Sequence, residues 1–162
     1  MKKTLAQQEA ARKKSLGELG ELFGIKALVD DEFDCIRNLN DDKMNYPYAD
    51  LYAEKSGQRY VISVKSRNKF QKNGKQNTQY NLGNNVHLKA ADAEKDKNAI
   101  AYWMAIEFDK LTYSVYFGPL SDLEDKKAIS IKECEKNDKY WLVKDKRHFF
   151  DFDYFENIKS ID

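Results

Sequence analysis

Residues 46–66 read YPYADLYAEKSGQRYVISVKS, and this stretch predicts two strands joined by a tight turn. Residues 48–55 alternate well enough for a half-buried strand, while residues 59–66 are rich in the β-branched side chains that favour strands. Gly57 readily adopts the positive φ that a tight turn requires. The stretch therefore predicts a β-hairpin with Ser56 and Gly57 at its tip.

The predicted pairing brings an aspartate and a lysine together. Counting back from a two-residue turn gives three opposed pairs, which are Lys55 with Gln58, Asp50 with Ser63, and Tyr48 with Lys65. Opposed side chains lie about 5 Å apart and diagonal ones about 7 to 8 Å, so Asp50, Ser63 and Lys65 are expected to converge. Burying a charge is costly unless it is paired or bound to a metal, which leaves both a salt bridge and a metal site open.

A helix is predicted over residues 4–28, ahead of the hairpin. Its apolar stripe consists of Leu16, Leu19, Phe23 and Ala27, and Gly17, Gly20 and Gly24 lie beside that stripe. Each glycine costs a helix about 1 kcal/mol relative to alanine, which indicates close approach of another segment. Glu21 borders the glycine face and Glu18 points further round, so Glu21 is the acid expected to reach the sheet. A solvated carboxylate is the competing interpretation.

The remaining patterns alternate between strand and helix. Strands are predicted over residues 33–39, 99–108 and 112–117, shorter strands over 127–132 and 139–143, and a helix over 86–97. The aromatic residues of the paired strands, Tyr102, Trp103, Tyr113, Tyr116 and Phe117, are assigned to packing rather than to base stacking. The aromatic tail over residues 149–158 is expected to cover a sheet edge or form a dimer interface. Together these elements predict one α/β domain spanning residues 1–162, a length that can bury a single core.

The net charge of +1 conceals a basic segment. Residues 55–91 carry eight Lys or Arg and no Asp or Glu. Four of these cations follow the hairpin, namely Arg67, Lys69, Lys72 and Lys75, and they are the expected phosphate contacts. A solubilising loop is the competing interpretation, but the absence of acids favours a polyanionic partner. The charge pattern does not distinguish DNA from RNA.

The segment YPYAD ending at Asp50, the short hairpin, and VISVKS with Ser63 and Lys65 resemble the signature of the PD-(D/E)XK nucleases. This superfamily includes restriction endonucleases and Holliday junction resolvases, and the resemblance covers residues 16–80. Its pattern is an Asp at the end of one strand, then an acid, any residue and a Lys on the next strand, after a helix that often supplies Glu. The resemblance implies a restriction-endonuclease-like fold with a central mixed sheet flanked by helices.

The resemblance also implies a reaction and a cofactor. Asp50 would bind Mg²⁺ or Mn²⁺, Glu21 would hold the metal directly or through water, and the backbone carbonyl of Val64 would face it. Lys65 would orient the attacking water or help to deprotonate it. In this superfamily such a site hydrolyses phosphodiester bonds. The resemblance therefore implies that the protein is an endonuclease acting on DNA. A homodimer is a further expectation, since many nucleases of this fold cut two strands with two copies of one site.

Ser63 stands where the superfamily pattern has Asp or Glu. A serine hydroxyl is a weaker ligand for a hard cation than a carboxylate. Two interpretations stay open. Either Glu21 or Glu54 compensates for the missing acid, or the fold has lost its hydrolytic activity and the protein binds nucleic acid or a protein partner.

Other enzyme classes are less well supported. Ser63 as a nucleophile with Lys65 as its base would leave Asp50 without a role, and the sequence around it lacks a nucleophile elbow. Asn73-Gly74-Lys75 lacks the glycine spacing of a phosphate-binding loop.

The first residues and the cysteines indicate the compartment. No apolar run follows the N-terminal lysines, so neither a signal peptide nor a membrane span is expected and a cytoplasmic protein is predicted. Cys35 and Cys134 lack C-x-x-C spacing and are predicted to be reduced structural thiols.

Overall fold

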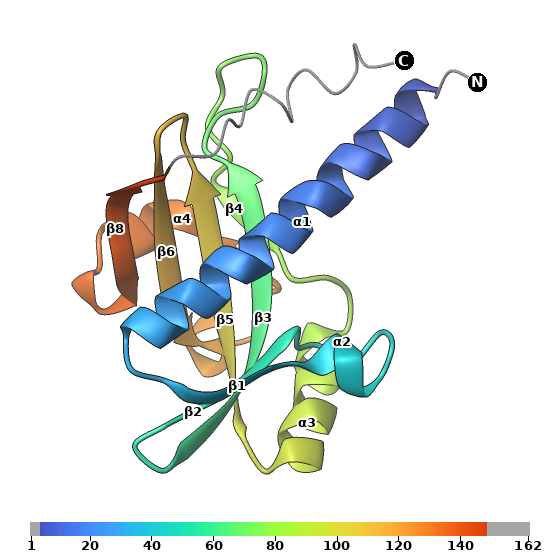
Figure 1. Cartoon of the computed structure of the whole chain (residues 1–162), viewed down its shortest axis with the longest axis vertical. Coiled ribbons are helices and arrows are strands. Elements are labelled where there is room, and N and C mark those ends of the chain that lie inside the picture. The colour runs from blue at the N-terminus through green and yellow to red at the C-terminus, as the bar shows by residue number, and fades with distance from the viewer. Residues whose placement is uncertain (1–3, 149–162) are drawn as a thin grey trace.

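A mixed six-stranded sheet forms the centre of the molecule in the computed structural model, which describes residues 4–148 (Figure 1). Its strands are β1 (Asp34–Asn38), β2 (Leu51–Lys55), β3 (Gln58–Asn68), β5 (Ile100–Phe108), β6 (Thr112–Pro119) and β8 (Trp141–Arg147), in the order β1-β2-β3-β5-β6-β8. Neighbouring strands are antiparallel except β3 and β5, which run parallel. A parallel pair needs a long crossover, and α3 (Val86–Lys97) lies within it.

Helices cover both faces of the sheet. The long helix α1 (Leu5–Asp30) crosses one face diagonally (Figure 1). The other face carries α3, α4 (Ile131–Glu135) and a two-stranded sheet of β4 (Gln79–Asn81) and β7 (Ala128–Ser130). The short elements are α2 (Leu39–Asp42) and the 3-10 turns η1 (Leu120–Leu123) and η2 (Asp138–Tyr140). The predicted α/β class, with a mixed sheet flanked by helices, is confirmed.

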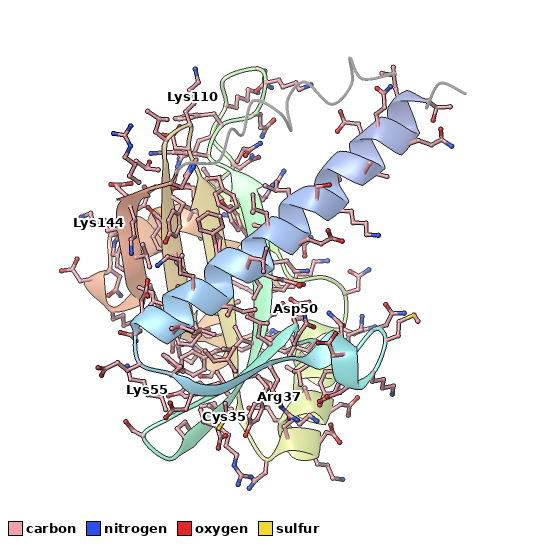
Figure 2. The ribbon with its side chains drawn as sticks, viewed as in Figure 1. Cys35, Arg37, Asp50, Lys55, Lys110 and Lys144 are labelled. Atoms are coloured by element: carbon pink, nitrogen blue, oxygen red, sulfur yellow. The ribbon has the colours of Figure 1, made fainter. Side chains whose placement is uncertain are left out.

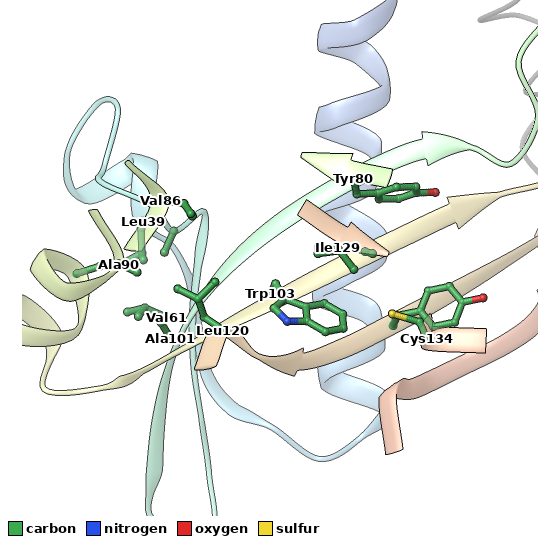
Figure 3. Packing of buried hydrophobic residues seen from close by; sticks show 14 of the residues in the cluster. Leu39, Val61, Tyr80, Val86, Ala90, Ala101, Trp103, Leu120, Ile129 and Cys134 are labelled. Atoms are coloured by element: carbon green, nitrogen blue, oxygen red, sulfur yellow. The ribbon is translucent and has the colours of Figure 1, made fainter. Parts of the chain in front are cut away.

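Strands β3 and β5 are buried on both faces, as expected for a parallel pair at the centre of a sheet. Towards α1, Ile62 and Met104 pack with Phe23 in one core. Towards α3, Val61 and Trp103 belong to a second core, and Figure 3 shows this face with α1 behind the sheet. The predicted packing role of the strand aromatics is confirmed, because Trp103, Tyr113 and Tyr116 are buried and Tyr102 and Phe117 pack against the cores.

Helix α1 begins with a capping box, in which Thr4 and Gln7 exchange hydrogen bonds. It extends two residues beyond the predicted end. The close approach predicted from the glycines is confirmed at Gly20, which packs on Ser66 of β3, and at Gly24, where an added Cβ would lie 3.0 Å from the sulfur of Met104. It is wrong at Gly17, where, apart from the adjacent backbone of the helix itself, no atom of residues 4–148 lies within 4 Å of an added Cβ.

The predicted hairpin and its register are confirmed for β2 and β3. Ser56 (φ 51°) and Gly57 (φ 79°) form a two-residue turn, and pairing runs from Lys55–Gln58 to Leu51–Ile62. The strand starts three residues later than predicted, so the pairs expected for Asp50 and Tyr48 do not form part of the ladder. Tyr48 has a φ of 64°, which breaks the extended conformation, and its hydroxyl donates to the carbonyl of Tyr102 at 2.6 Å.

Some smaller predictions need correction. The strand expected over residues 127–132 stops at Ser130, because the Ser130 hydroxyl accepts from the Glu133 N–H and caps α4. The last strand lies at residues 141–147 rather than 139–143, since η2 occupies the first positions. The aromatic tail over residues 149–158 lies outside the described residues. Cys35 and Cys134 are free thiols, as predicted. In residues 4–148, each helix is too short or too polar to cross a membrane.

The glycines of α1 provide a matched pair of mutations. Gly20→Ala would place its Cβ 2.6 Å from the Cβ of Ser66, so we expect it to lower the free energy of unfolding by about 2 kcal/mol. The added Cβ of Gly17→Ala has no described atom within 4 Å beyond the adjacent helix backbone, so this mutation should raise the free energy of unfolding by about 0.5 to 1 kcal/mol. Urea unfolding of both variants measures the difference. Equal effects of the two mutations would contradict the packing of α1 on β3.

Candidate functional site

Asp50 lies directly before β2, at the point where β3 is no longer paired with β2. On its other edge β3 stays paired with β5. Its backbone N–H donates to the carbonyl of Ile62 at 2.9 Å, and its carboxylate Oδ2 accepts from the N–H of Val64 at 2.8 Å. The carboxylate thus accepts the hydrogen bond that the carbonyl of a neighbouring strand would otherwise accept from β3. In Figure 2 Asp50 lies between α1 and α2.

The surroundings of Asp50 set its charge. Loss of solvation raises the pKa of this carboxyl above its usual range, while the N–H of Val64, the positive charge of Lys65 and the side chain of Asn40 oppose that rise. Lys65 is half-buried on β3. Asp50 is therefore a desolvated carboxyl whose anionic form depends on nearby donors and cations.

The Val64 carbonyl also points towards the Asp50 side of β3. In a strand, the N–H and C=O of one residue point to the same side. Since the N–H of Val64 is directed at Asp50, its carbonyl oxygen lies on the same free edge.

Helix α1 brings a second carboxylate to Asp50. Glu21 is half-buried, and its pKa is raised by burial and by the negative charge of Asp50, while a hydrogen bond from Asn38 lowers it. The Nδ2 of Asn38 lies 3.4 Å from the Oε2 of Glu21. Glu18 is exposed and lies 4.0 Å from Lys14 on the same helix. Of the two helix acids, Glu21 is the one whose pKa the charge of Asp50 raises.

Two asparagines that sequence reasoning missed contact the two carboxylates. Asn38 donates to Glu21, and Asn40 donates to Asp50. Between them, the N–H of Leu39 donates to the carbonyl of Asp50 at 2.9 Å, and the Asn38 side chain caps α2 through the N–H of Asn40. One turn of chain therefore ties Glu21 and Asp50 together. In the sequence, an asparagine near the end of a predicted strand and another just after it carried no signal of this role.

Ser63 and Glu54 do not add a carboxylate to this pair. Ser63 is only 2% exposed and lies opposite Trp103 of β5. Glu54 lies at the far end of β2 and has its Oε1 3.9 Å from the Nε of Arg59. Within residues 4–148, His, Cys, Asp and Glu side chains form no group of three suited to a metal ion. The candidate site rests on two carboxylates.

A basic groove starts at Lys65 and has a volume of about 490 Å³. Helix α1 contributes Lys13, β3 contributes Lys65 and Arg67, and the following loop contributes Phe70 and Lys72. Among residues 4–148, none of those that line the groove is acidic. The two expected contacts Arg67 and Lys72 thus share one groove with Lys65.

The other two expected phosphate contacts lie on the same loop, residues 69–78, here named the basic loop. Lys69 places its Nζ 5.7 Å from the ring centroid of Phe70, and Lys75 is exposed. Neither lines the groove. They add positive charge near its wall.

Glu107 of β5 is a buried acid outside the candidate site. It is 5% exposed, lies opposite Arg67 in the sheet, and its Oε2 lacks a hydrogen-bond partner among the described residues. Burial raises its pKa to about 7, although the charge of Lys69 and a hydrogen bond from Gln76 oppose the rise. An acid inside the apolar run of residues 104–108 was the sequence signal for it.

Comparison with known proteins gives a likeness at the level of structure but not of sequence. The chain matches no family model and no curated protein sequence. Its structure is similar to that of Hjc, a Holliday junction resolvase from the archaeal hyperthermophile Archaeoglobus fulgidus, with a TM-score of 0.53 and 18% identity. The match covers 74% of this chain and 88% of Hjc. Hjc has a restriction-endonuclease-like fold, and the same fold expected for this chain is confirmed.

Glu107 makes the stability of the protein depend on pH. Its folded-state pKa of about 7 lies above the ordinary value of 4.5, so the folded state holds the proton more tightly than the unfolded state. The free energy of unfolding should therefore fall by about 1 to 3 kcal/mol as pH rises through that interval. Urea unfolding at several pH values measures the change.

Glu107→Gln should flatten this dependence, because it removes the ionisable group. Asp92→Asn, which changes an exposed acid on α3, is the matched control and should leave the slope unchanged. If the free energy of unfolding of Glu107→Gln still falls with pH as in the native protein, groups other than Glu107 cause the dependence.

Proposed function

We propose that this protein is a metal-dependent nuclease that hydrolyses phosphodiester bonds of DNA at Asp50 and Lys65. The observation that carries the proposal is a pair of desolvated carboxyls, Asp50 and Glu21, beside Lys65 at the start of a groove lined by cations. The restriction-endonuclease-like fold and the Holliday junction resolvase Hjc as a structural neighbour support DNA as the substrate.

The donors around Asp50 fit Mg²⁺ or Mn²⁺. Mg²⁺ in proteins is held by one or two carboxylates, while waters and substrate phosphates complete its coordination. Asp50 and Glu21 supply the carboxylates, and the Val64 carbonyl is available on the same edge. The negative charge of Asp50 raises the pKa of Glu21, and a cation between them would relieve that repulsion. When bound, such an ion lowers the pKa of water and neutralises charge that grows on the phosphate.

Each charged residue of the candidate site has a role in the proposed reaction. Asp50 is held in place by the N–H of Val64, and Glu21 binds the metal directly or through water. Lys65 provides positive charge next to Asp50, where it orients the attacking water or helps to remove its proton. Arg67 and Lys72 hold phosphates of the bound strand along the groove that starts at Lys65.

Ser63 supports a second candidate function, a catalytically silent module that binds DNA or a protein partner. The serine is a buried residue of β3, at the position where the family pattern has an acid. With one carboxylate fewer, the site binds a cation more weakly. The basic groove would still bind a polyanion.

Cleavage of labelled linear, circular, single-stranded and branched DNA with Mg²⁺ or Mn²⁺ tests the nuclease. Asp50→Asn removes a metal ligand and Lys65→Ala removes the charge at the water, so each should reduce the rate by at least about a hundredfold. Glu54→Gln, a change at the far end of the same hairpin, should leave cleavage unaffected. DNA binding without metal-dependent cleavage would favour the silent module.

Ser63→Glu restores the acid of the family pattern and should tighten Mn²⁺ binding by about tenfold, because one more carboxylate is available. Isothermal titration of the metal measures it, and Ser63→Ala serves as the control for loss of the hydroxyl. Circular dichroism establishes that each variant is folded. An unchanged Mn²⁺ affinity in a folded Ser63→Glu protein would show that position 63 does not face the metal.

A further inference from the structure

The basic loop is an ordered hairpin-like structure. Its backbone hydrogen bonds run from the N–H of Asn77 to Lys69 O (2.8 Å), from Gln71 to Lys75 O (2.7 Å) and from Gly74 to Gln71 O (2.9 Å), and Phe70 and Gln76 form a β-bridge. Asn77 anchors its base, because this buried side chain donates to the carbonyl of Asn68 at 2.7 Å. The backbone of the loop therefore has a defined conformation.

Phe70 is an aromatic side chain that this loop presents to the groove. It is 48% exposed although it lines the same groove as Lys65 and Arg67. The ammonium of Lys69 lies 5.7 Å from the ring centroid, and such an exposed cation–π contact contributes little. A half-exposed phenyl ring among cations has the two properties of a single-strand binding surface, a stacking platform and a path for phosphates.

We propose that Phe70 stacks on an unpaired nucleobase, so that the nuclease recognises DNA where a single strand is exposed. This inference rests on the proposed function. In a duplex, both faces of each base are covered by its neighbours, and a ring beside the backbone has no base to contact. At a fork, gap or branch, a base leaves the stack and its face becomes available to Phe70, while Arg67 and Lys72 bind the adjoining phosphates.

The stacked base would lie near the reacting bond. Lys65 and Phe70 are five residues apart, which bounds their Cα separation at about 17 Å for an extended chain. Both line one continuous groove. A strand held by Phe70 therefore passes Lys65 within a few nucleotides, and cleavage is expected close to the junction between duplex and single strand.

Binding of fluorescein-labelled DNA by the full chain in Ca²⁺ tests the proposal. Three probes share one sequence: a blunt duplex, a fork with single-stranded arms, and the same fork with abasic residues in its arms. The native protein should bind the fork more tightly than the other two. Phe70→Ala should weaken fork binding by about fivefold or more and leave duplex binding unchanged, and Phe70→Trp should restore fork binding. Leu88→Ala, an exposed apolar residue of α3 outside the groove, is the matched control and should change nothing.

The outcomes separate this inference from the proposed function. Native protein that binds DNA equally with or without bases in the arms would overturn the stacking role alone. So would a Phe70→Ala protein that keeps its preference for the fork, or that loses duplex and fork binding equally. Failure of the native protein to bind any of the three probes would overturn the proposed function together with this inference.

Discussion

The hydrogen bond from the Val64 N–H to the Asp50 carboxylate is the contact around which the candidate site is organised. Strand β2 begins at Leu51, opposite Ile62, so β3 has no strand partner on that edge beyond Ile62 among the described residues. An unpaired edge N–H needs a partner when it is partly buried. Asp50 is that partner, so its carboxylate is held at the edge of β3. The Val64 carbonyl lies on the same edge, and Lys65 is the next residue.

Helix α1 packs on one face of β3 and brings the second carboxylate, that of Glu21, to the candidate site. The helix backbone approaches Ser66 at Gly20, and the hydroxyl of Ser66 donates to the carbonyl of Leu16 at 3.1 Å. This contact fixes the axial position of α1 and hence the position of Glu21, one residue beyond Gly20. The same edge of β3 leads into the basic groove, so the fold places the two carboxylates, Lys65 and the groove cations Arg67 and Lys72 one after another beside β3.

Patterns that depend on local geometry could be predicted from the sequence. The two-residue turn at Ser56 and Gly57 sets the register of β2 and β3. The glycines of α1 predicted a close approach to another segment, but not which glycine makes it, since Gly20 and Gly24 do and Gly17 does not. Features that depend on tertiary contacts could not be predicted. Tyr48 leaves the strand for a hydrogen bond to Tyr102, which is distant in sequence, and the amides of Asn38 and Asn40 reach their carboxylates only after β1 and α1 have packed.

Diffraction from crystals soaked in Mn²⁺, recorded at a wavelength where manganese scatters anomalously, tests the Asp50 site most directly. The predicted result is an anomalous peak in contact with the Asp50 carboxylate, with Glu21 and the Val64 carbonyl bound to it directly or through water. Asp50→Asn crystals should lose the peak. Manganese bound elsewhere in saturated crystals, with no peak at Asp50, would contradict a metal-dependent site at this edge of β3.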